Sequence, residues 1–529
     1  MTGAAGDVES IAALIERAAT THSDTVAVVD GDERVTYAEL FDRARSFGAA
    51  LVASGVEPGD RVAIWAPNSL EWIVALLGLF RAGAVLVPVN TRFKGAEAAD
   101  ILGRSHAKVL VTVTDFLGTD FVGLLASAGA SLPDLTTTVV ASGPVPDGCI
   151  AWRALLDRVD DEALAEVDRR SASLRGDDVA DILFTSGTTG MPKGVVQTHD
   201  RTLRVATDWV DMTGLHAGDR YLMVNPYFHM FGLKAGILAC VAAGATMFPE
   251  PAFDVDRALA RVAAERITVL PGAPTLYQSI LDHPHRDDHD LSSLRIAVTG
   301  AADIPVELIR RIVDELPFPS IVTGYGLTEG GTASATSPDD DIETIATTVG
   351  RARPGFEVRI VDGGADAVHG TPGEILLRGG SIMSHYLDDP DATGDALSPD
   401  GWLRTGDIGV VDERGCLRIV GRSKDMYIVG GFNAYPAEIE NILLRHPDVA
   451  QAAVIGIPDA RLGEVGMAFV VPRPGSEPSE ASIVAWSRDQ MANYKVPRVV
   501  ELIDALPLNA TGKVEKLVLR ERAAARAGS

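Results

Sequence analysis

The sequence predicts an α/β protein: a large N-terminal domain of layered sheets and helices that includes a small barrel, followed by a mobile α+β C-terminal domain. Three observations lead to this prediction. Residues 23–150 alternate short apolar runs with helical patterns, which indicates βα units and largely parallel sheets. From about residue 346 the pattern changes to short strands separated by Gly and Asp turns, and a new α+β unit begins after Gly421. We therefore expect two domains, 1–421 and 422–529.

In the first domain, short apolar runs of up to six residues predict buried strands, and longer amphipathic segments predict helices. We expect strands at 61–65, 85–89, 108–113 and 179–184, with a helix at 37–54. The alternation resumes further on, with strands expected at 267–270, 294–298 and 321–322.

The small barrel or meander is expected to contain strands at 358–361, 374–377 and 417–420. The C-terminal domain should then contain a helix at 436–446, strands at 449–457 and 467–471, and a helix at 480–491. We expect the tail, 520–529, to be a fraying helix without a function.

One stretch, 72–89, is apolar enough to suggest a membrane segment. Arg81 and Gly83 divide it, so a buried helix followed by a buried strand is the better interpretation. The N-terminus lacks the basic start and apolar run of a signal peptide. These features favour a cytoplasmic protein.

Composition restricts the class of partner. The 529 residues are 46% hydrophobic and 23% charged, which is typical of a globular enzyme. A net charge of −26 argues against nucleic acid or an anionic membrane as the main partner. Any site for an anionic substrate must therefore be locally positive, and the candidates for that charge are Lys193, Arg404, Arg422, Lys424 and Lys513.

Cysteine and histidine patterns do not indicate a metal cluster. Cys149, Cys240 and Cys416 are far apart in the sequence, which favours a reducing compartment without disulfides. The His- and Asp-rich segment 282–290 has no regular ligand spacing, so we interpret it as a solvated loop.

The segment 185–195 has the composition of an anion-binding loop. Six of its first seven residues are Gly, Ser or Thr, and Lys193 follows near its end. Glycines allow the backbone to approach an anion, hydroxyls donate to phosphate oxygens, and a lysine supplies a compact positive charge. The spacing does not match a Walker A loop, so a different class of nucleotide site is expected.

Five further motifs follow this loop in order. They lie at 226–232, 324–329, 402–407, 421–436 and 507–513. Together with the loop they resemble the ordered motifs of the acyl-activating superfamily, which contains acyl-CoA synthetases, luciferases and peptide-synthetase adenylation domains. The resemblance covers residues 10–520 and implies the acyl-CoA synthetase/luciferase-like fold.

The resemblance implies a two-step reaction with ATP, Mg²⁺ and coenzyme A. A carboxylate first attacks the α-phosphate of ATP, which releases pyrophosphate and leaves an acyl-adenylate. A thiol, usually that of coenzyme A, then attacks the activated carbonyl and expels AMP. Cations near the reacting phosphate would stabilise the charge that develops in the first step.

The resemblance also implies an ATP site. Tyr325 would stack on adenine, Glu329 would bind Mg²⁺, Thr328 would contact the α-phosphate, and Asp407 would bind the ribose with Arg422 beside it. Backbone at Gly300, Ala301 and Ala302 would line the adenine pocket. The residues implied to hold the pyrophosphate end of ATP are Thr185, Ser186, Gly187, Thr188, Thr189, Gly190 and Lys193.

The resemblance implies further roles for residues that act on the acid, approach the thiol, or allow the C-terminal domain to rotate. His229 would gate or contact the acyl pocket, and Lys513 would be the adenylation lysine. Lys424 would be the hinge about which the C-terminal domain rotates, bringing Gly430 and Gly431 to the thiol tunnel.

Several segments favour one class of acid. No carboxylate occurs at 227–231 to pair with an ammonium group, which disfavours an amino-acid substrate. The segments 225–229, 234–240, 267–272, 275–279 and 425–433 resemble the actinobacterial CoA ligases of steroid degradation that activate HIP, a methyl-hexahydroindane-dione propanoate. The residues at 191–192, Met230 and Leu233 differ from that group, and Lys234 is either a contact to a substrate ketone or a structural lysine.

Other substrates and functions stay open at this stage. The acid could instead be a short- or medium-chain fatty acid or an aromatic acid. The enzyme could load the acyl group onto a carrier protein or stop at the adenylate. An inactive binding protein would have lost Lys513, Glu329 or Asp407, and all three are present. Homodimers are common among the families that the motifs resemble.

Overall fold

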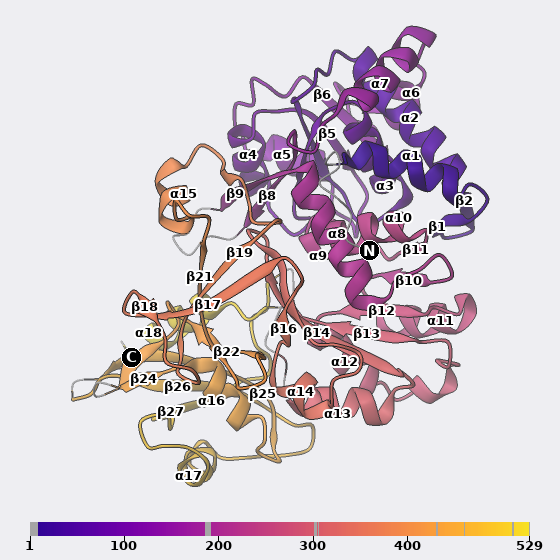
Figure 1. Cartoon of the computed structure of the whole chain (residues 1–529). Helices are drawn as coiled ribbons and strands as arrows, with labels where there is room; N and C mark the ends of the chain where they lie inside the picture. The colour runs from indigo at the N-terminus through magenta and orange to yellow at the C-terminus, as the bar shows by residue number, and fades with distance from the viewer. Residues whose placement is uncertain are drawn as a thin grey trace.

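The computed structural model describes residues 9–185, 192–300, 304, 306–429, 432–459, 461–509 and 513–527. Four sheets organise these residues (Figure 1). The two largest belong to the N-terminal part of the chain, a small antiparallel sheet follows, and the fourth sheet contains the C-terminal strands.

The first large sheet has eight strands in the order β20-β9-β8-β4-β3-β5-β6-β7. Parallel pairing runs from β8 through β4, β3, β5 and β6 to β7, whereas β9 and β20 add to one edge in antiparallel fashion. The strands are β3 (Arg61–Trp65), β4 (Val85–Pro88), β5 (Ala107–Val113), β6 (Thr137–Ser142), β7 (Ile150–Ala151), β8 (Val179–Thr185), β9 (Lys193–Thr198) and β20 (His385–Tyr386). The predicted strands at 61–65, 85–89, 108–113 and 179–184 are thus confirmed to within one residue at each end.

The second large sheet has nine strands in the order β16-β15-β14-β13-β12-β10-β11-β1-β2. The five strands from β14 to β11 are parallel, as is β1 beside β11, while β2, β15 and β16 are antiparallel. They are β1 (Val26–Asp30), β2 (Glu33–Thr36), β10 (Arg220–Met223), β11 (Thr246–Pro249), β12 (Val269–Gly272), β13 (Ile296–Thr299), β14 (Ser320–Leu327), β15 (Gly331–Ala335) and β16 (Arg351–Ala352). The strand predicted at 267–270 begins two residues later than expected.

Helices pack between and around the two large sheets (Figure 1). In chain order they are α1 (Ile11–Thr21), α2 (Tyr37–Ala53), α3 (Leu70–Arg81), α4 (Gly95–Arg104), α5 (Phe121–Ser127), α6 (Trp152–Leu156), α7 (Asp161–Ser173), α8 (His199–Thr213), α9 (Met230–Gly232), the π-helix η1 (Leu233–Leu238), α10 (Ala239–Ala243), α11 (Val255–Glu265), α12 (Pro274–Leu281), the 3₁₀ turn η2 (Arg286–Asp288), α13 (Val306–Glu315), α14 (Ile342–Thr347) and α15 (Pro390–Ala396). Ser10, Thr36 and Ser69 cap the first three helices by accepting backbone N–H bonds.

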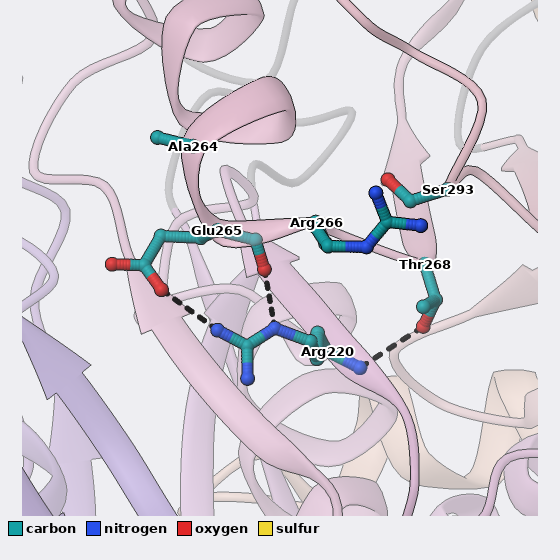
Figure 2. Close-up of a pocket in the computed structure, with 6 residues that line it drawn as sticks. All are labelled: Arg220, Ala264, Glu265, Arg266, Thr268 and Ser293. Atoms are coloured by element: carbon teal, nitrogen blue, oxygen red, sulfur yellow. Dashed lines mark hydrogen bonds and ion pairs between the residues drawn. The ribbon is translucent and has the colours of Figure 1, made fainter.

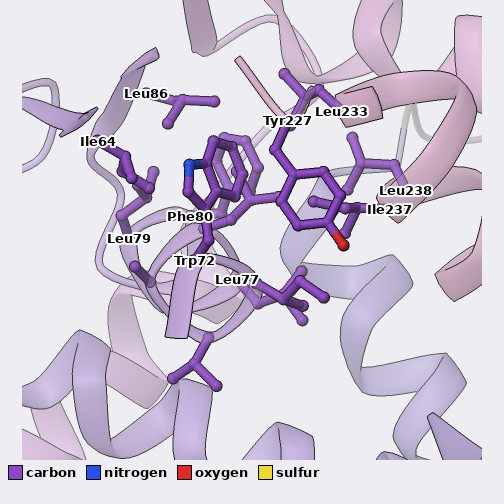
Figure 3. Packing of buried hydrophobic residues seen from close by; sticks show 14 of the residues in the cluster. Ile64, Trp72, Leu77, Leu79, Phe80, Leu86, Tyr227, Leu233, Ile237 and Leu238 are labelled. Atoms are coloured by element: carbon purple, nitrogen blue, oxygen red, sulfur yellow. The ribbon is translucent and has the colours of Figure 1, made fainter. Parts of the chain in front are cut away.

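The apolar stretch at 72–89 forms the centre of the core. Helix α3 is buried along nearly its whole length, and Trp72 packs edge-on against Tyr227 with ring centroids 5.3 Å apart (Figure 3). Arg81, at the end of α3, is buried because it pairs with Asp168 at 2.9 Å and lies over the Phe41 ring at 4.2 Å. Within the described part of the chain, every helix is too short or too polar to span a bilayer.

The third sheet is a five-stranded antiparallel sheet in the order β18-β17-β19-β21-β22. It contains β17 (Phe356–Asp362), β18 (Ala365–Asp366), β19 (Gly373–Gly379), β21 (Leu403–Val411) and β22 (Leu417–Arg422). Its successive hairpins form a meander, which was one of the two predicted alternatives. The sheet packs on the N-terminal part through a core that includes Val195, Ala333 and Leu377.

The C-terminal strands form a separate sheet in the order β24-β23-β26-β25, and β27 also pairs with β26. Its elements are β23 (Tyr427–Val429), β24 (Phe432–Ala434), α16 (Pro436–Leu443), β25 (Val449–Asp459), β26 (Gly463–Pro472), α17 (Glu480–Gln490), β27 (Val499–Leu502) and α18 (Lys516–Ala527). Two clusters of buried apolar side chains lie on this sheet. It follows that these residues have a core of their own.

The helix predicted at 520–529 is present as far as Ala527, as part of α18, but it packs on the C-terminal sheet instead of fraying. Helix α18 buries Leu519 and Ala523 against β25 and β26. Arg520 pairs with Asp425 at 3.1 Å, and Arg522 pairs with Glu501 at 2.6 Å. The sequence shows only a charged helix here, because the two buried positions are too few to give a strong amphipathic pattern.

Helices α2 and α3 approach so closely that their contact requires glycine. A Cβ atom at Gly78 would lie 2.6 Å from the carbonyl oxygen of Ala44, and one at Gly48 would lie 2.7 Å from the carbonyl oxygen of Gly78. Neither distance allows a methyl group without separating the helix backbones.

We predict that Gly78→Ala lowers the free energy of unfolding by about 1–3 kcal/mol, because it overpacks this helix contact. Thermal or urea unfolding followed by circular dichroism would measure the change. Gly394→Ala is the matched control, since an added Cβ on helix α15 meets nothing within 4 Å. Equal stability of Gly78→Ala and the wild type would show that the helices can move apart at no cost.

Candidate functional site

A buried carboxylate connects two of the predicted motifs. Asp407, on β21, is 5% exposed and accepts a hydrogen bond from the Tyr325 hydroxyl at 2.5 Å. Arg422, opposite it on β22, pairs with its other oxygen at 3.0 Å. Burial, and then the Asp407 charge, raise the pKa of Tyr325 well above its usual value, so the phenol stays a donor. The structure therefore brings together three residues that the sequence separates by up to 97 positions.

A second carboxylate, Glu329, lies on the turn after β14. Its Oε1 accepts a hydrogen bond from the hydroxyl of Tyr386 at 2.9 Å. The Lys193 ammonium lies 4.9 Å from the centroid of the same tyrosine ring. Burial, followed by the Glu329 charge, raises the pKa of Tyr386. Tyr386 thus links the lysine of the anion-binding loop to the expected metal ligand, and sequence reasoning missed it.

Backbone contacts fix the position of Thr328 and Glu329. Gln197, buried on β9, donates to the carbonyl oxygens of Thr328 and Ser381, each at 3.3 Å. The backbone N–H of Met383 donates to the Glu329 carbonyl at 2.7 Å. A glutamine in a strand carries no recognisable motif, which is why the sequence did not single out Gln197.

The anion-binding loop is the connection of a β-hairpin. Thr185 ends β8 and Lys193 begins β9, and the two residues are directly paired across the strands. The Thr185 hydroxyl donates to the Lys193 carbonyl at 3.5 Å. The other members of the predicted phosphate site lie outside the described residues; they are Ser186, Gly187, Thr188, Thr189 and Gly190.

Gly300 follows strand β13 at the edge where the parallel strands end. A Cβ atom there would lie 3.3 Å from the carbonyl oxygen of Gly324, so the two backbone segments run close together. Gly300 thus follows the carboxyl end of β13, and Tyr325 lies just beyond Thr323, the last residue of β14 that pairs with β13. Ala301 and Ala302, which were predicted with Gly300, lie outside the described residues.

His229 lies at the start of the short helix α9, where its Nδ1 accepts the backbone N–H of Phe231 at 3.2 Å. Burial, and then the positive charge of Lys513, lower its pKa to about 4. The imidazole is therefore neutral at physiological pH. With Nδ1 accepting, Nε2 carries the proton and is available as a donor.

Asn68 holds the segment that leads to His229. Its side-chain amide donates to the carbonyl oxygens of Met223 and Asn225, at 2.9 and 3.0 Å, and its Oδ1 accepts the backbone N–H of Tyr227 at 2.9 Å. Asn68 and its three partners are more than 150 positions apart in the sequence, so the residues around Asn68 did not indicate this role.

The C-terminal residues approach the same region. Lys513 is close enough to His229 for its charge to lower the histidine pKa. The side chain of Lys424 is exposed, and partial desolvation, followed by the charge of Arg422, lowers its pKa. Gly430 and Gly431, expected to approach the thiol, lie outside the described residues.

The structure also shows where Lys234 and Arg404 lie and what they pair with. Lys234 is fully buried, where it pairs with Asp181 at 2.9 Å and donates to the Thr202 hydroxyl at 2.9 Å. These contacts agree with the structural role among the alternatives. Arg404 does not join the site, since it is exposed and pairs with Glu374 at 2.7 Å.

The described residues also line an open cavity of about 380 Å³ that is separate from the candidate site (Figure 2). Arg220 and Thr268, which line it, mark the amino ends of β10 and β12. Gly300 and His229 instead follow the carboxyl ends of β13 and β10 in the same sheet, and Tyr325 lies just beyond the part of β14 that pairs with β13. Ligands of open α/β sheets bind at carboxyl ends, so the cavity lies at the opposite edge.

Glu329 fits the expected magnesium ion. Mg²⁺ prefers oxygen ligands and is usually held by one or two carboxylates together with substrate phosphates. Glu329 is partly exposed and uses one oxygen for Tyr386, which leaves the second for a metal. In the described part of the chain, no three His, Cys, Asp or Glu side chains are grouped as a dedicated metal cage.

Comparison with known proteins agrees with this arrangement. Residues 15–387 match the AMP-binding enzyme family, and residues 438–513 match the AMP-binding enzyme C-terminal domain. Two relatives, from Mycobacterium tuberculosis and Rhodococcus jostii, are named as CoA ligases of a propanoyl group carried on a 7a-methyl-1,5-dioxo-octahydroindene ring. The first is 50% identical over 97% of this chain and 99% of the relative, and the second is 48% identical over 96% and 97%.

Solved structures share the fold over almost the whole chain. The anthranilate CoA ligase AuaEII in complex with anthranoyl-AMP has a TM-score of 0.90 at 29% identity, covering 99% of both chains. ATP-bound MatB from Rhodopseudomonas palustris has a TM-score of 0.84 at 30% identity, covering 97% of this chain and 99% of the other. The predicted resemblance to acyl-CoA synthetases is confirmed, and the chain belongs to the AMP-binding enzyme family.

Proposed function

We propose that this protein is an ATP-dependent acid:CoA ligase that forms an acyl-CoA through an acyl-adenylate, with HIP as its acid. The observation that supports the acid is the identity of 48–50% to two ligases named for this propanoyl group, over nearly the full length of each. Identity at this level over nearly the full length supports the same fold and the same class of reaction in the chain and those relatives. The three cysteines are free thiols, which suits work in the reducing cytoplasm.

In the first step, a carboxylate oxygen of the acid attacks the α-phosphorus of ATP, and the bond to pyrophosphate breaks. Asp407 accepts hydrogen bonds in a buried position and suits the ribose hydroxyls, with Tyr325 against the adenine. Lys193 supplies positive charge on the pyrophosphate side, while Lys513 supplies it near the reacting groups. A magnesium ion held by Glu329 would neutralise further phosphate charge.

The neutral state of His229 suits a role beside the carboxylate of the acid. An imidazolium next to Lys513 would add repulsion, whereas a neutral ring can donate one hydrogen bond from Nε2. In the second step the thiol of coenzyme A attacks the acyl carbonyl and AMP leaves. We propose that Lys424 is the hinge for this step and that the segment with Gly430 and Gly431 approaches the thiol.

Pyrophosphate release with ATP and Mg²⁺, measured with and without coenzyme A, tests the proposal. The acids would be HIP, straight-chain acids of several lengths, and aryl propanoates. HIP should give the highest kcat/KM, with turnover that depends on coenzyme A. A higher kcat/KM for a fatty or aromatic acid would overturn the substrate, and release that is independent of coenzyme A would overturn the ligase.

Lys513→Ala should slow adenylate formation by about 10²-fold or more, because it removes a cation that stabilises the developing charge. Thioester formation from supplied acyl-adenylate and coenzyme A should continue at close to the wild-type rate. Rapid-quench measurement of each half-reaction separates the two effects. Loss of both half-reactions to the same extent would contradict a role confined to the first step.

Tyr386→Phe should raise the Mg²⁺ concentration needed for half-maximal adenylation by about three- to tenfold, because Glu329 loses a hydrogen bond that orients it. A magnesium titration at saturating ATP measures this shift. Tyr427→Phe is the control, since the Tyr427 hydroxyl has no hydrogen-bond partner among the described residues. An unchanged magnesium dependence in Tyr386→Phe would separate Tyr386 from the metal site.

His229→Ala should raise KM for the acid by about tenfold while leaving KM for ATP within about twofold, because one hydrogen bond to the carboxylate is lost. Because the His229 pKa is about 4, protonation of this ring should not affect the wild-type rate between pH 5.5 and 8. Steady-state kinetics with each substrate varied in turn would check both expectations. A larger effect on ATP than on the acid would move His229 out of the acyl pocket.

A further inference from the structure

One hydrogen bond joins the N-terminal domain directly to the segment that carries Lys513. The guanidinium of Arg92 donates from Nη1 to the backbone carbonyl of Asn509 at 3.2 Å. Arg92 lies shortly after β4, in the first large sheet, and 417 positions separate the two residues. Asn509 belongs to the motif at 507–513, whereas Arg92 lies outside all six motifs.

The position of Asn509 determines the position of the Lys513 backbone. The N–H of Asn509 donates to the carbonyl of Lys513 at 2.8 Å, and the N–H of Lys513 donates to the Asn509 Oδ1 at 2.9 Å. Leu508 and Val514 form a β-bridge on either side of this pair. A hydrogen bond to the Asn509 carbonyl therefore also restrains the Lys513 backbone, because the two residues are hydrogen-bonded to each other.

Arg92 is itself held by the core of the N-terminal domain. Its backbone N–H donates to the Asn90 Oδ1 at 2.9 Å. The Asn90 carbonyl accepts the indole N–H of Trp65 at 2.9 Å, and Trp65 is fully buried on β3. The base of the Arg92 side chain is thus fixed to the sheet, while its guanidinium reaches outward.

The Arg92 bond differs in its location from the other contacts between the two domains. Tyr435, just before α16, packs on Ile408, Val410 and Val420 of the third sheet. The Ser423 N–H donates to the Gly406 carbonyl at 2.9 Å, also beside the hinge. These contacts lie beside the proposed hinge, whereas the Arg92 bond is made to the segment that contains Lys513.

We propose that Arg92 is a positioning residue for the adenylation step: its bond to Asn509 holds the C-terminal domain in the orientation that places Lys513 in the site. The inference rests on the proposed role of Lys513. The closeness of Lys513 to His229 in this same orientation supports it, since the Lys513 charge acts on that ring.

The Arg92–Asn509 hydrogen bond suits a contact that forms during adenylation and opens before the thiol attacks. Arg92 is exposed to solvent, so its guanidinium is well hydrated when the bond opens. A single hydrogen bond of this kind changes an equilibrium by about three- to tenfold. That is enough to bias the domain orientation during adenylation, yet small enough to be released for attack by the thiol.

The test compares the two half-reactions in Arg92→Ala. Adenylate formation from HIP and ATP, followed by rapid quench, should fall about three- to tenfold. Thioester formation from supplied acyl-adenylate and coenzyme A should stay at the wild-type rate or rise. Equal losses in both half-reactions, or no loss in either, would overturn the proposal, provided that the variant keeps the wild-type melting temperature.

Two further variants distinguish an effect on the position of Lys513 from a general effect of removing a surface arginine. Arg43→Ala is the matched control, because Arg43 is an exposed arginine that pairs with Glu33 at 2.7 Å on the N-terminal surface. It should leave both half-reactions unchanged. In the Lys513→Ala background, Arg92→Ala should cause no additional loss of adenylation in single-turnover experiments, because Arg92 acts through Lys513. An additional loss of threefold or more would show that Arg92 acts by another route.

Failure of this inference can be distinguished from failure of the proposed function. A wild-type protein that forms no adenylate from any acid would contradict the ligase itself. A wild-type protein that forms the adenylate, together with an Arg92→Ala variant that does so equally fast, would contradict only the role of Arg92.

Discussion

Strand β9 is the element on which the candidate site depends. It pairs with β8 to form the hairpin of the anion-binding loop, and its other edge receives β20, which contains Tyr386. Its buried Gln197 donates to the carbonyls of Thr328 and Ser381. Because these hydrogen bonds and strand pairings meet on β9, the strand constrains three chain segments at once, and Lys193, Glu329 and Tyr386 come together as a consequence.

The site also depends on how the C-terminal domain is oriented. The Asp407–Arg422 pair and the packing of Tyr435 locate the start of that domain on the third sheet. Arg92 restrains the far end, near Lys513, with one exposed hydrogen bond. The two domains are therefore joined both near the proposed hinge and near Lys513.

Local charge explains how a chain with a net charge of −26 can serve an anionic substrate. Salt screens the interactions of exposed carboxylates with charges more than about 10 Å away. Within the site, Asp407 is paired with Arg422, and Glu329 is hydrogen-bonded by Tyr386. Lys193 and Lys513 are the cations that we propose for the substrate phosphates, and burial together with the charge of Lys513 lowers the pKa of His229 to about 4.

The sequence by itself determined the fold class, the family and most of the candidate residues, because strand periodicity and ordered motifs are local features of the chain. It did not reveal Tyr386, Gln197, Asn68 or Arg92. Each of these acts through a contact that crosses at least 57 positions, and none has a distinctive local pattern. It also left the burial of α18 and the role of Lys234 open. Only the tertiary structure decided these points, since burial and hydrogen-bond partners depend on which remote segments the fold brings together.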